Sequence, residues 1–217
     1  MQLCEQYRPR EWGDVIGQDK AARIVAALRP RGLTGRAYWI SGPSGTGKTT
    51  IARLLAAEVA ESWAVVEVDA TDLLPTALRD IESTWSTLPL ADRPGRAYLV
   101  NEAHGLRRDT VRQLLTMLER IPRHCLVVFT TTTDGQAALF DGVDDAHPLL
   151  SRCTLLSLTS QGLANPGADR LLTIATTEGL RNGHGDDDDR RRLVRLIHEN
   201  KGNLRAALQA VESGALL

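Results

Sequence analysis

Cysteine is scarce in this sequence of 217 residues. Its three cysteines, Cys4, Cys125 and Cys153, are too few and too scattered for a disulfide framework, and no Cys-x-x-Cys pair offers a zinc site. The chain also lacks an apolar run of membrane-spanning length, and its first residues lack the basic-then-apolar order of a secretion signal. These absences predict a cytoplasmic protein that does not enter a membrane.

An excess of basic residues is absent as well. The formal net charge is −1 and the pI is about 6.5, which excludes a protein that coats nucleic acid by bulk electrostatics. Any contact with DNA must therefore be local. Lysine is limited to Lys20, Lys48 and Lys201, and Lys48 lies in a glycine-rich loop, where a compact ammonium is preferred to a planar guanidinium.

Apolar runs alternate with helical patterns through the first three quarters of the chain. The length allows one full α/β core and a small appended domain. Short apolar runs predict strands at 37–41, 64–68, 97–100 and 125–129, and helical periodicity predicts helices at 18–28, 49–60, 76–86 and 109–120. Such alternation predicts an α/β fold with a parallel sheet covered by helices.

The character of the sequence changes near Pro166. Only helical patterns follow, at 169–179, 186–200 and 203–213. We therefore predict a nucleotide-binding core over residues 1–164 and a small, all-helical lid domain over residues 165–217.

A Gly-x-x-x-x-Gly-Lys-Thr pattern connects the first strand to the helix that follows it. Its glycines allow close backbone approach, so that successive N–H groups can surround a phosphate at a helix N-terminus. Lys48 is expected to reach the β- and γ-phosphate oxygens, and the Thr49 hydroxyl to bind Mg²⁺. The predicted nucleotide-binding residues of this loop are Gly42, Pro43, Ser44, Gly45, Thr46, Gly47, Lys48, Thr49 and Thr50.

A second polar cluster follows the strand at 97–100. In P-loop NTPases the residue that ends this strand is usually an aspartate that holds the magnesium shell, and the next acid polarises the attacking water. Here the first position is Asn101 and the second is Glu102. Glu102 is the candidate general base, whereas Asn101 can only accept from a metal-bound water, with weaker electrostatics. We predict an ATPase with reduced turnover.

These motifs resemble the AAA+ ATPase subunits of DNA sliding-clamp loaders, particularly the bacterial gamma/tau type and its replication factor C relatives. The similarity runs from Tyr7 to about Ser213. Tyr7-Arg8-Pro9-Arg10 and Val15-Ile16-Gly17-Gln18 resemble the N-terminal segment that packs around adenine in this family. The resemblance implies that Tyr7, Arg8, Val15 and Ile16 contribute to the nucleotide site.

The resemblance also implies three residues that sense or complete the γ-phosphate site. Thr133 lies in the segment Phe129-Thr130-Thr131-Thr132-Thr133-Asp134, which resembles the end of the sensor 1 strand. Arg205 lies in the sensor 2-like Gly202-Asn203-Leu204-Arg205, and Arg152 lies in Ser151-Arg152-Cys153. In clamp loaders the arginine of that tripeptide acts in trans on ATP bound by the neighbouring subunit, where its guanidinium neutralises charge on the γ-phosphate. A homo- or hetero-oligomer of AAA+ subunits is therefore expected.

The sequence departs from the family in three ways. It has no four-cysteine module after the P-loop helix, so no structural zinc is expected. The stretch from Gly135 to His147 is longer than in the family. The sequence also ends at Leu217, before the helical collar that joins clamp-loader subunits. Assembly then rests on the AAA+ interfaces alone, or a partner supplies the collar, or the function is not clamp loading.

Three functions remain open. The first is a clamp-loader-like motor in DNA replication, in which ATP binding drives subunit assembly and grip on DNA or a sliding clamp, and hydrolysis releases it. The second is a nucleotide-dependent scaffold whose hydrolysis is attenuated by Asn101. The third is an AAA+ motor for another DNA transaction. Arg107, Arg108 and Arg112 either line a DNA channel or form a solvated helix face.

Overall fold

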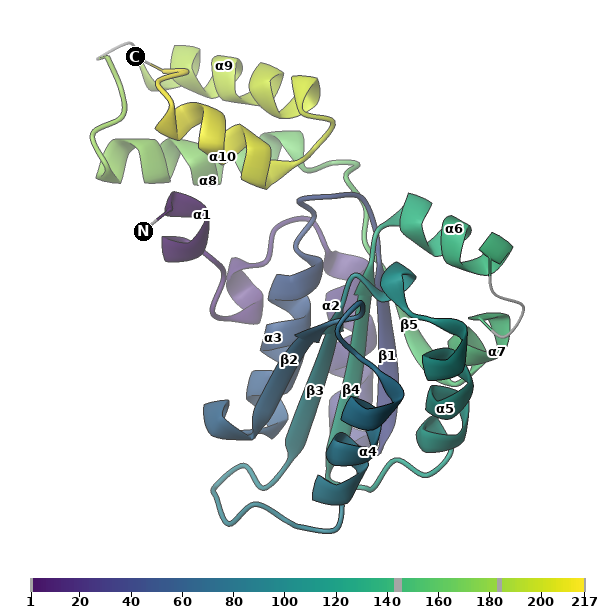
Figure 1. Cartoon of the computed structure of the whole chain (residues 1–217). Helices are drawn as coiled ribbons and strands as arrows, with labels where there is room; N and C mark the ends of the chain where they lie inside the picture. Colours follow the sequence, from purple (N-terminus) through teal and green to yellow (C-terminus); the bar gives the residue numbers. More distant parts are fainter. Residues whose placement is uncertain (1, 143–145, 183–184, 217) are drawn as a thin grey trace. The chain divides into compact units, whose positions relative to one another are not determined.

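The computed structural model describes residues 2–142, 146–182 and 185–216 (Figure 1). The chain divides into two compact units. One contains Lys20–Gly42 and Lys48–Leu158, and we call it the sheet unit. The other contains the residues up to Asp19, the loop segment Pro43–Gly47 and the residues from Thr159 onward, and we call it the helical unit.

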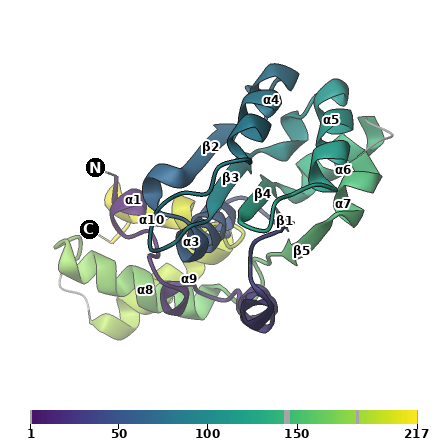
Figure 2. The same ribbon diagram turned by 90° about the horizontal axis from the view of Figure 1, so that it is seen from below.

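The sheet unit is built on five parallel strands in the order β2-β3-β4-β1-β5, with β2 and β5 at opposite edges (Figure 2). The central strand β4 is buried along its whole length, as expected for a sheet that helices cover on both faces. The predicted α/β fold with a helix-covered parallel sheet is therefore confirmed. The strands are β1 (Arg36–Ser41), β2 (Val65–Asp69), β3 (Arg96–Asn101), β4 (Cys125–Thr131) and β5 (Cys153–Ser157).

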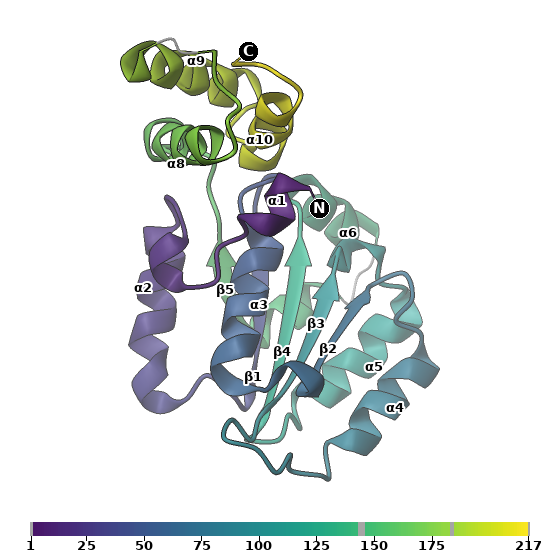
Figure 3. The ribbon, with the colours of Figure 1, turned by 90° about the vertical axis from the view of Figure 1, so that its left-hand side faces the viewer.

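Helices cover both faces of this sheet. Helices α2 and α3 lie on one face and α4 and α5 on the other, and the strand arrows end at the same edge (Figure 3). Polar residues that follow the strands are therefore brought to one edge of the sheet. The helices of this unit are α2 (Asp19–Leu28), α3 (Lys48–Val59), α4 (Pro75–Thr84), α5 (Arg108–Leu118), α6 (Thr133–Gly142) and α7 (Ala146–Ser151), with 3-10 turns at Arg29–Arg31, Ser62–Ala64 and Ala103–Gly105.

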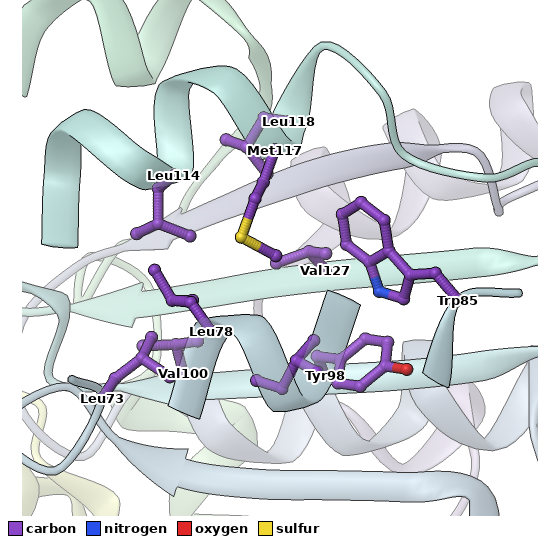
Figure 4. Close-up of a pocket in the computed structure, with 10 residues that line it drawn as sticks. Leu73, Leu78, Trp85, Tyr98, Val100, Leu114, Met117, Leu118 and Val127 are labelled. Atoms are coloured by element: carbon purple, nitrogen blue, oxygen red, sulfur yellow. The ribbon is translucent and has the colours of Figure 1, made fainter. Parts of the chain in front are cut away.

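The main hydrophobic core lies between α4, α5 and the sheet. The rings of Trp39 and Phe129 pack with their centroids 5.6 Å apart, and both side chains are fully buried. A small apolar cavity remains between the two helices and strands β3 and β4, where Leu78, Trp85 and Met117 point toward one another (Figure 4). Its lining is hydrocarbon, ring and thioether, so it is a packing space of the core rather than a site with polar recognition groups.

The helical unit has its own core. Leu3 of α1, Leu171 of α8, Ile197 of α9 and Leu208 of α10 are buried together, because each amphipathic helix presents one apolar stripe to the others. The first turn of α9 carries four aspartates, of which Asp189 is completely buried and accepts from Arg181 Nε at 2.7 Å. The elements are α1 (Leu3–Gln6), α8 (Ala164–Thr177), α9 (Asp186–Glu199) and α10 (Leu204–Glu212), with a 3-10 turn at Trp12–Asp14.

Neither a membrane-crossing helix nor a metal-ligand cluster is found in the described part of the chain. Within residues 2–142, 146–182 and 185–216, no helix has the length and apolar character needed to cross a bilayer. The same residues contain no group of three or more His, Cys, Asp or Glu side chains placed to hold a metal ion. Burial raises the pKa of the Cys125 and Cys153 thiols to about 12, so neither is a reactive thiolate at neutral pH.

Candidate nucleotide site

The glycine-rich loop connects the end of β1 to the first residue of α3. Gly45 and Gly47 have φ of 74° and 95°, values that side-chain-bearing residues rarely adopt. Lys48 is the first residue of α3, only 8% exposed, and its Nζ donates to the Gly42 carbonyl oxygen at 3.0 Å. Thr49 follows it, half-buried, and Thr50 is buried. The loop therefore places the Lys48 ammonium beside the loop backbone, whose N–H groups are expected to bind phosphate.

Close packing around two of the glycines explains why larger residues are excluded. A Cβ at Gly42 would lie 2.8 Å from the carbonyl oxygen of Leu158, within the sheet unit. A Cβ at Gly45 would lie 1.8 Å from Asn203 Oδ1, within the helical unit. Asn203 is also the N-cap of α10, where its Oδ1 accepts from Ala206 N at 3.1 Å. The loop tip thus packs against the start of the sensor 2-like helix.

Gln18 holds the same loop tip in the helical unit. Its side chain is 4% exposed, and its Nε2 donates to the carbonyl oxygens of Thr46 at 3.3 Å and Thr159 at 2.9 Å. The Thr159 N–H donates back to Gln18 Oε1 at 3.2 Å. A buried amide satisfied by three backbone groups fixes their relative positions. The sequence signal was the single glutamine of Val15-Ile16-Gly17-Gln18, to which the motif alone assigned no role.

Asn101 ends β3 and is held by side chains from the two neighbouring strands. Its Nδ2 donates to Glu67 Oε1 at 2.7 Å, and its Oδ1 accepts from Thr130 Oγ1 at 3.0 Å. Arg53 of α3 donates to both oxygens of Glu67, at 2.9 Å and 3.1 Å. We call Arg53, Glu67, Asn101 and Thr130 the strand-end cluster. Sequence reasoning missed Arg53, Glu67 and Thr130, because their proximity depends on the strand order.

Glu102 follows in a left-handed backbone conformation, with φ of 51° and ψ of 50°. Such values in a residue other than glycine cost roughly 1–3 kcal/mol and concentrate at functional sites. The side chain is exposed, and its Oε2 lies 3.4 Å from Nδ1 of His104, which in turn lies 3.3 Å from Thr131 Oγ1. The predicted general base is therefore accessible and has a histidine beside it.

The predicted sensor and finger residues lie on exposed positions. Thr133 is the exposed first residue of α6, and Arg205 is an exposed residue in the first turn of α10. The Arg152 side chain is 31% exposed, and its guanidinium pairs with Glu119 and donates to the Pro148 carbonyl oxygen at 2.9 Å. These positions leave each polar group accessible, and their contacts with nucleotide stay predictions.

The N-terminal segment is anchored within the helical unit. Tyr7 Oη donates to Glu178 Oε1 at 2.5 Å, and this hydrogen bond is the main reason that the pKa of Tyr7 is raised. Arg8 pairs with Glu5, with Arg8 Nε donating to Glu5 Oε2 at 3.1 Å. Val15 and Ile16 are half-buried. Of the four residues predicted for adenine, Tyr7 is thus tied to Glu178, which follows α8, and Arg8 to Glu5 of α1, whereas the contacts of all four with nucleotide stay predictions.

A parallel sheet, a glycine-rich loop between β1 and α3, and polar residues at the carboxyl end of β3 together define a P-loop nucleotide-binding protein. The family described as "ATPase family associated with various cellular activities (AAA)" matches residues 38–158. That match covers more than half of the sequence, and the chain belongs to the AAA family. Membership implies that it binds ATP with Mg²⁺.

Curated relatives refine this assignment. The chain is 28% identical to DNA polymerase III subunit tau of Escherichia coli (strain K12), over 98% of this chain and 35% of the relative. It is 26% identical to the replication factor C small subunit of Thermofilum pendens, over 98% of this chain and 62% of that protein. The chain therefore spans only part of the length of each relative. The matches confirm the predicted resemblance to clamp-loader ATPase subunits.

Solved structures agree on the fold. The Thermotoga maritima RuvB Holliday junction branch migration motor superposes with a TM-score of 0.68 at 21% identity, covering 95% of this chain and 64% of that one. A point mutant of the same RuvB gives a TM-score of 0.70 at 20% identity, covering 95% of this chain and 65% of that one. These TM-scores show a shared fold, and at 20–21% identity the likeness shows the fold alone.

Proposed function

We propose that this chain is an ATP-dependent, clamp-loader-like subunit of a DNA replication machinery. In this proposal, ATP binding drives assembly with other AAA+ subunits and grip on DNA or a sliding clamp, and hydrolysis releases that grip. The observation that carries it is the combination of a complete phosphate loop around buried Lys48 with an accessible arginine, Arg152, in a clamp-loader tripeptide. The named relatives, subunits of DNA polymerase III and replication factor C, support the same interpretation.

The residues present fit ATP and magnesium chemically. The loop offers positive-φ glycines, a helix N-terminus and the Lys48 ammonium to the phosphates. Thr49 and Asn101 offer a hydroxyl and an amide oxygen toward a hydrated magnesium ion, which takes oxygen ligands and keeps several of its waters. Bound magnesium would supply charge neutralisation at the phosphates. Tyr7, Arg8, Val15 and Ile16 are the residues that we assign to the adenine side.

Hydrolysis is assigned to Glu102 as general base and Thr133 as the sensor of the γ-phosphate. The accessible carboxylate of Glu102, displayed on a left-handed turn, supports a role in orienting the attacking water. Because Asn101 carries no negative charge, turnover is expected to be slower than in a relative with aspartate at that position.

Coupling between subunits is assigned to Arg152 in trans and Arg205 from the lid. Nucleotide can shift assembly only through contacts that are stronger in the ATP state. Arg152 meets this requirement if its cis partner Glu119, whose side chain is 58% exposed, releases it. An exposed ion pair is worth little, so the γ-phosphate of a neighbour's ATP can replace Glu119 at low cost.

A hydrolysis-attenuated scaffold is the second candidate function. The observation in its favour is that the Asn101 amide is engaged by Glu67 and Thr130 on both sides. Under this alternative the ATP-bound assembly persists, and turnover is negligible with or without DNA.

Sizing and turnover measured together separate the candidates. The proposal predicts a larger particle with a non-hydrolysable ATP analogue, and faster ATP turnover with primed DNA or a clamp. Arg152→Ala should abolish that stimulation while nucleotide affinity stays unchanged. Arg93→Ala removes another exposed arginine paired with a glutamate, Glu61, and should leave stimulation intact. A single particle size under all conditions would contradict the proposal, whereas assembly without stimulation would favour the scaffold.

A further inference from the structure

Asn101 differs from a carboxylate at the same position in its hydrogen-bonding groups. A carboxylate at this position would accept hydrogen bonds from both oxygens, whereas an amide has one accepting end and one donating end. Beside a hydrated cation only the accepting end is useful, because metal-bound water donates its hydrogens. The side-chain orientation of Asn101 therefore decides whether the residue can assist magnesium.

Glu67 sets that orientation. An ionised carboxylate only accepts, so Glu67 Oε1 can pair with the Nδ2 end of Asn101 and not with the Oδ1 end; the observed separation is 2.7 Å. Thr130 donates to Oδ1 at 3.0 Å. A hydroxyl can donate or accept, so Thr130 alone would tolerate either orientation of the amide. Glu67 therefore determines the orientation of the Asn101 amide.

Arg53 in turn holds Glu67. Its Nε and Nη2 donate to the two carboxylate oxygens at 2.9 Å and 3.1 Å, a two-pronged arrangement that fixes the plane of the carboxylate. Arg53 lies in α3, the helix whose first residue is Lys48. Helix α3 thus carries both Lys48, which we assign to the phosphates, and Arg53, which holds Glu67.

The parallel register explains how Glu67 reaches this position. Asp69 of β2 is the register partner of Asn101, and Glu67 is partnered with Leu99, one side-chain repeat earlier on the same face. The longer glutamate side chain extends diagonally to the end of β3, as the 2.7 Å hydrogen bond shows. Glutamate suits this position because its side chain is one methylene longer than that of aspartate.

We propose that Glu67 is a positioning residue that orients the Asn101 amide, so that Oδ1 is the atom offered to a magnesium-bound water. Oδ1 has a second lone pair besides the one that accepts from Thr130. Asn101 and Glu67 then form a matched pair: an amide is required at position 101 because Glu67 stands beside it. This inference rests on the proposed binding of ATP with magnesium.

The test measures the magnesium advantage, defined as the affinity for a fluorescent, non-hydrolysable ATP analogue with Mg²⁺ divided by its affinity in EDTA. In Glu67→Ala we expect the advantage to fall about fivefold, the equivalent of one hydrogen bond, while the affinity in EDTA stays unchanged. Glu67→Gln keeps an accepting oxygen but can rotate, so a fall of about twofold is expected.

Glu58→Gln is the matched control. Glu58 lies in α3 and, like Glu67, is held through both oxygens by an arginine: Arg29 donates to it at 2.8 Å and 2.9 Å in an exposed pair. Its loss should leave the magnesium advantage unchanged. Thermal melts of all variants establish that they fold, and Glu67→Gln carries the test if Glu67→Ala does not fold.

Three results would overturn the inference. The first is a full magnesium advantage in the Glu67 variants, and the second is no advantage in the unsubstituted protein. The third is an equal loss in Glu58→Gln, which would make the effect a general consequence of removing an ion pair. The proposed function fails separately, if the analogue does not bind under either condition or if Lys48→Ala binds it as tightly as the unsubstituted protein.

Discussion

The glycine-rich loop, which we assign to the phosphates, and the strand-end cluster, which we assign to magnesium, are built in different ways. The loop is one contiguous segment, Gly42–Thr49, and it works through backbone conformation, a helix N-terminus and one buried ammonium. The strand-end cluster takes one side chain each from α3, β2, β3 and β4. The backbone geometry of the loop follows from a local sequence motif, whereas the side-chain network depends on which strands and helices become neighbours in the fold.

This difference determines how each region tolerates change. Steric limits are tight at two loop positions, because a Cβ at Gly42 would lie 2.8 Å from the Leu158 carbonyl oxygen and one at Gly45 would lie 1.8 Å from Asn203 Oδ1. In the strand-end cluster a change at one residue can be compensated at another, because hydrogen-bonding roles can be exchanged between partners. Substitutions in the two regions should therefore differ in size and in additivity.

Apart from Lys48, the largest effect is expected at Gly45. Gly45→Ala places a side chain at φ of 74° and 1.8 Å from Asn203 Oδ1. A left-handed backbone alone costs an alanine roughly 1–2 kcal/mol, and the displaced loop loses phosphate contacts. Nucleotide affinity measured by titration should fall by about 30-fold.

Gly13→Ala is the matched control, because a Cβ at Gly13 meets no atom within 4 Å. It should leave affinity unchanged. Equal affinity in Gly45→Ala and the unsubstituted protein would show that the loop tip does not hold phosphate.

A smaller and non-additive effect is expected at Asn101. Asn101→Asp restores the usual acid, but it sets two carboxylates against each other, because Glu67 Oε1 lies 2.7 Å from the replaced nitrogen. Steady-state turnover should rise little in this variant. Adding Glu67→Gln supplies a donor to the new acid, and the double variant should turn over about tenfold faster than Asn101→Asp alone. If the effects of the two substitutions on turnover simply add in this double-mutant cycle, the proposed pairing of Asn101 and Glu67 is contradicted.

The smallest effect is expected at Glu119. Glu119→Gln removes the charge that holds Arg152 within its own subunit. Since an exposed ion pair contributes at most about 1 kcal/mol, DNA-stimulated turnover should rise by about twofold, and the assembly midpoint should move to lower protein concentration. Sedimentation at several concentrations measures this shift. A fall in turnover would indicate that Glu119 supports Arg152 rather than competing for it.

The fold was largely predictable from the sequence. Helix-covered parallel strands are continuous apolar runs, so 125–129 and 97–100 identified β4 and β3. The prediction of where α8 starts was less accurate: the helix begins at Ala164 in the structure, whereas the predicted helix begins at residue 169. Pro166 and Gly167 suggested a linker, but both lie in the first turn, where proline needs no N–H partner.

The site was predictable only where it is local. The loop from Gly42 to Thr49 follows from a spacing rule, and the roles of its residues stay predictions. The partners of Asn101 could not be predicted, because Glu67 and Thr130 lie far from it in sequence and meet only through the order β2-β3-β4. Gln18 was missed for the same reason, since its partners Thr46 and Thr159 are distant in sequence.

The most direct test of the account is the affinity of Lys48→Ala for ATP with Mg²⁺, measured by calorimetry beside the unsubstituted protein and the Lys20→Ala control. Lys48 is buried in the phosphate loop, whereas Lys20 is exposed on α2. Loss of a charged hydrogen-bond donor to phosphate predicts a fall in affinity of about a hundredfold for Lys48→Ala and none for Lys20→Ala. Unchanged affinity in Lys48→Ala would contradict the assignment of this loop as the nucleotide site.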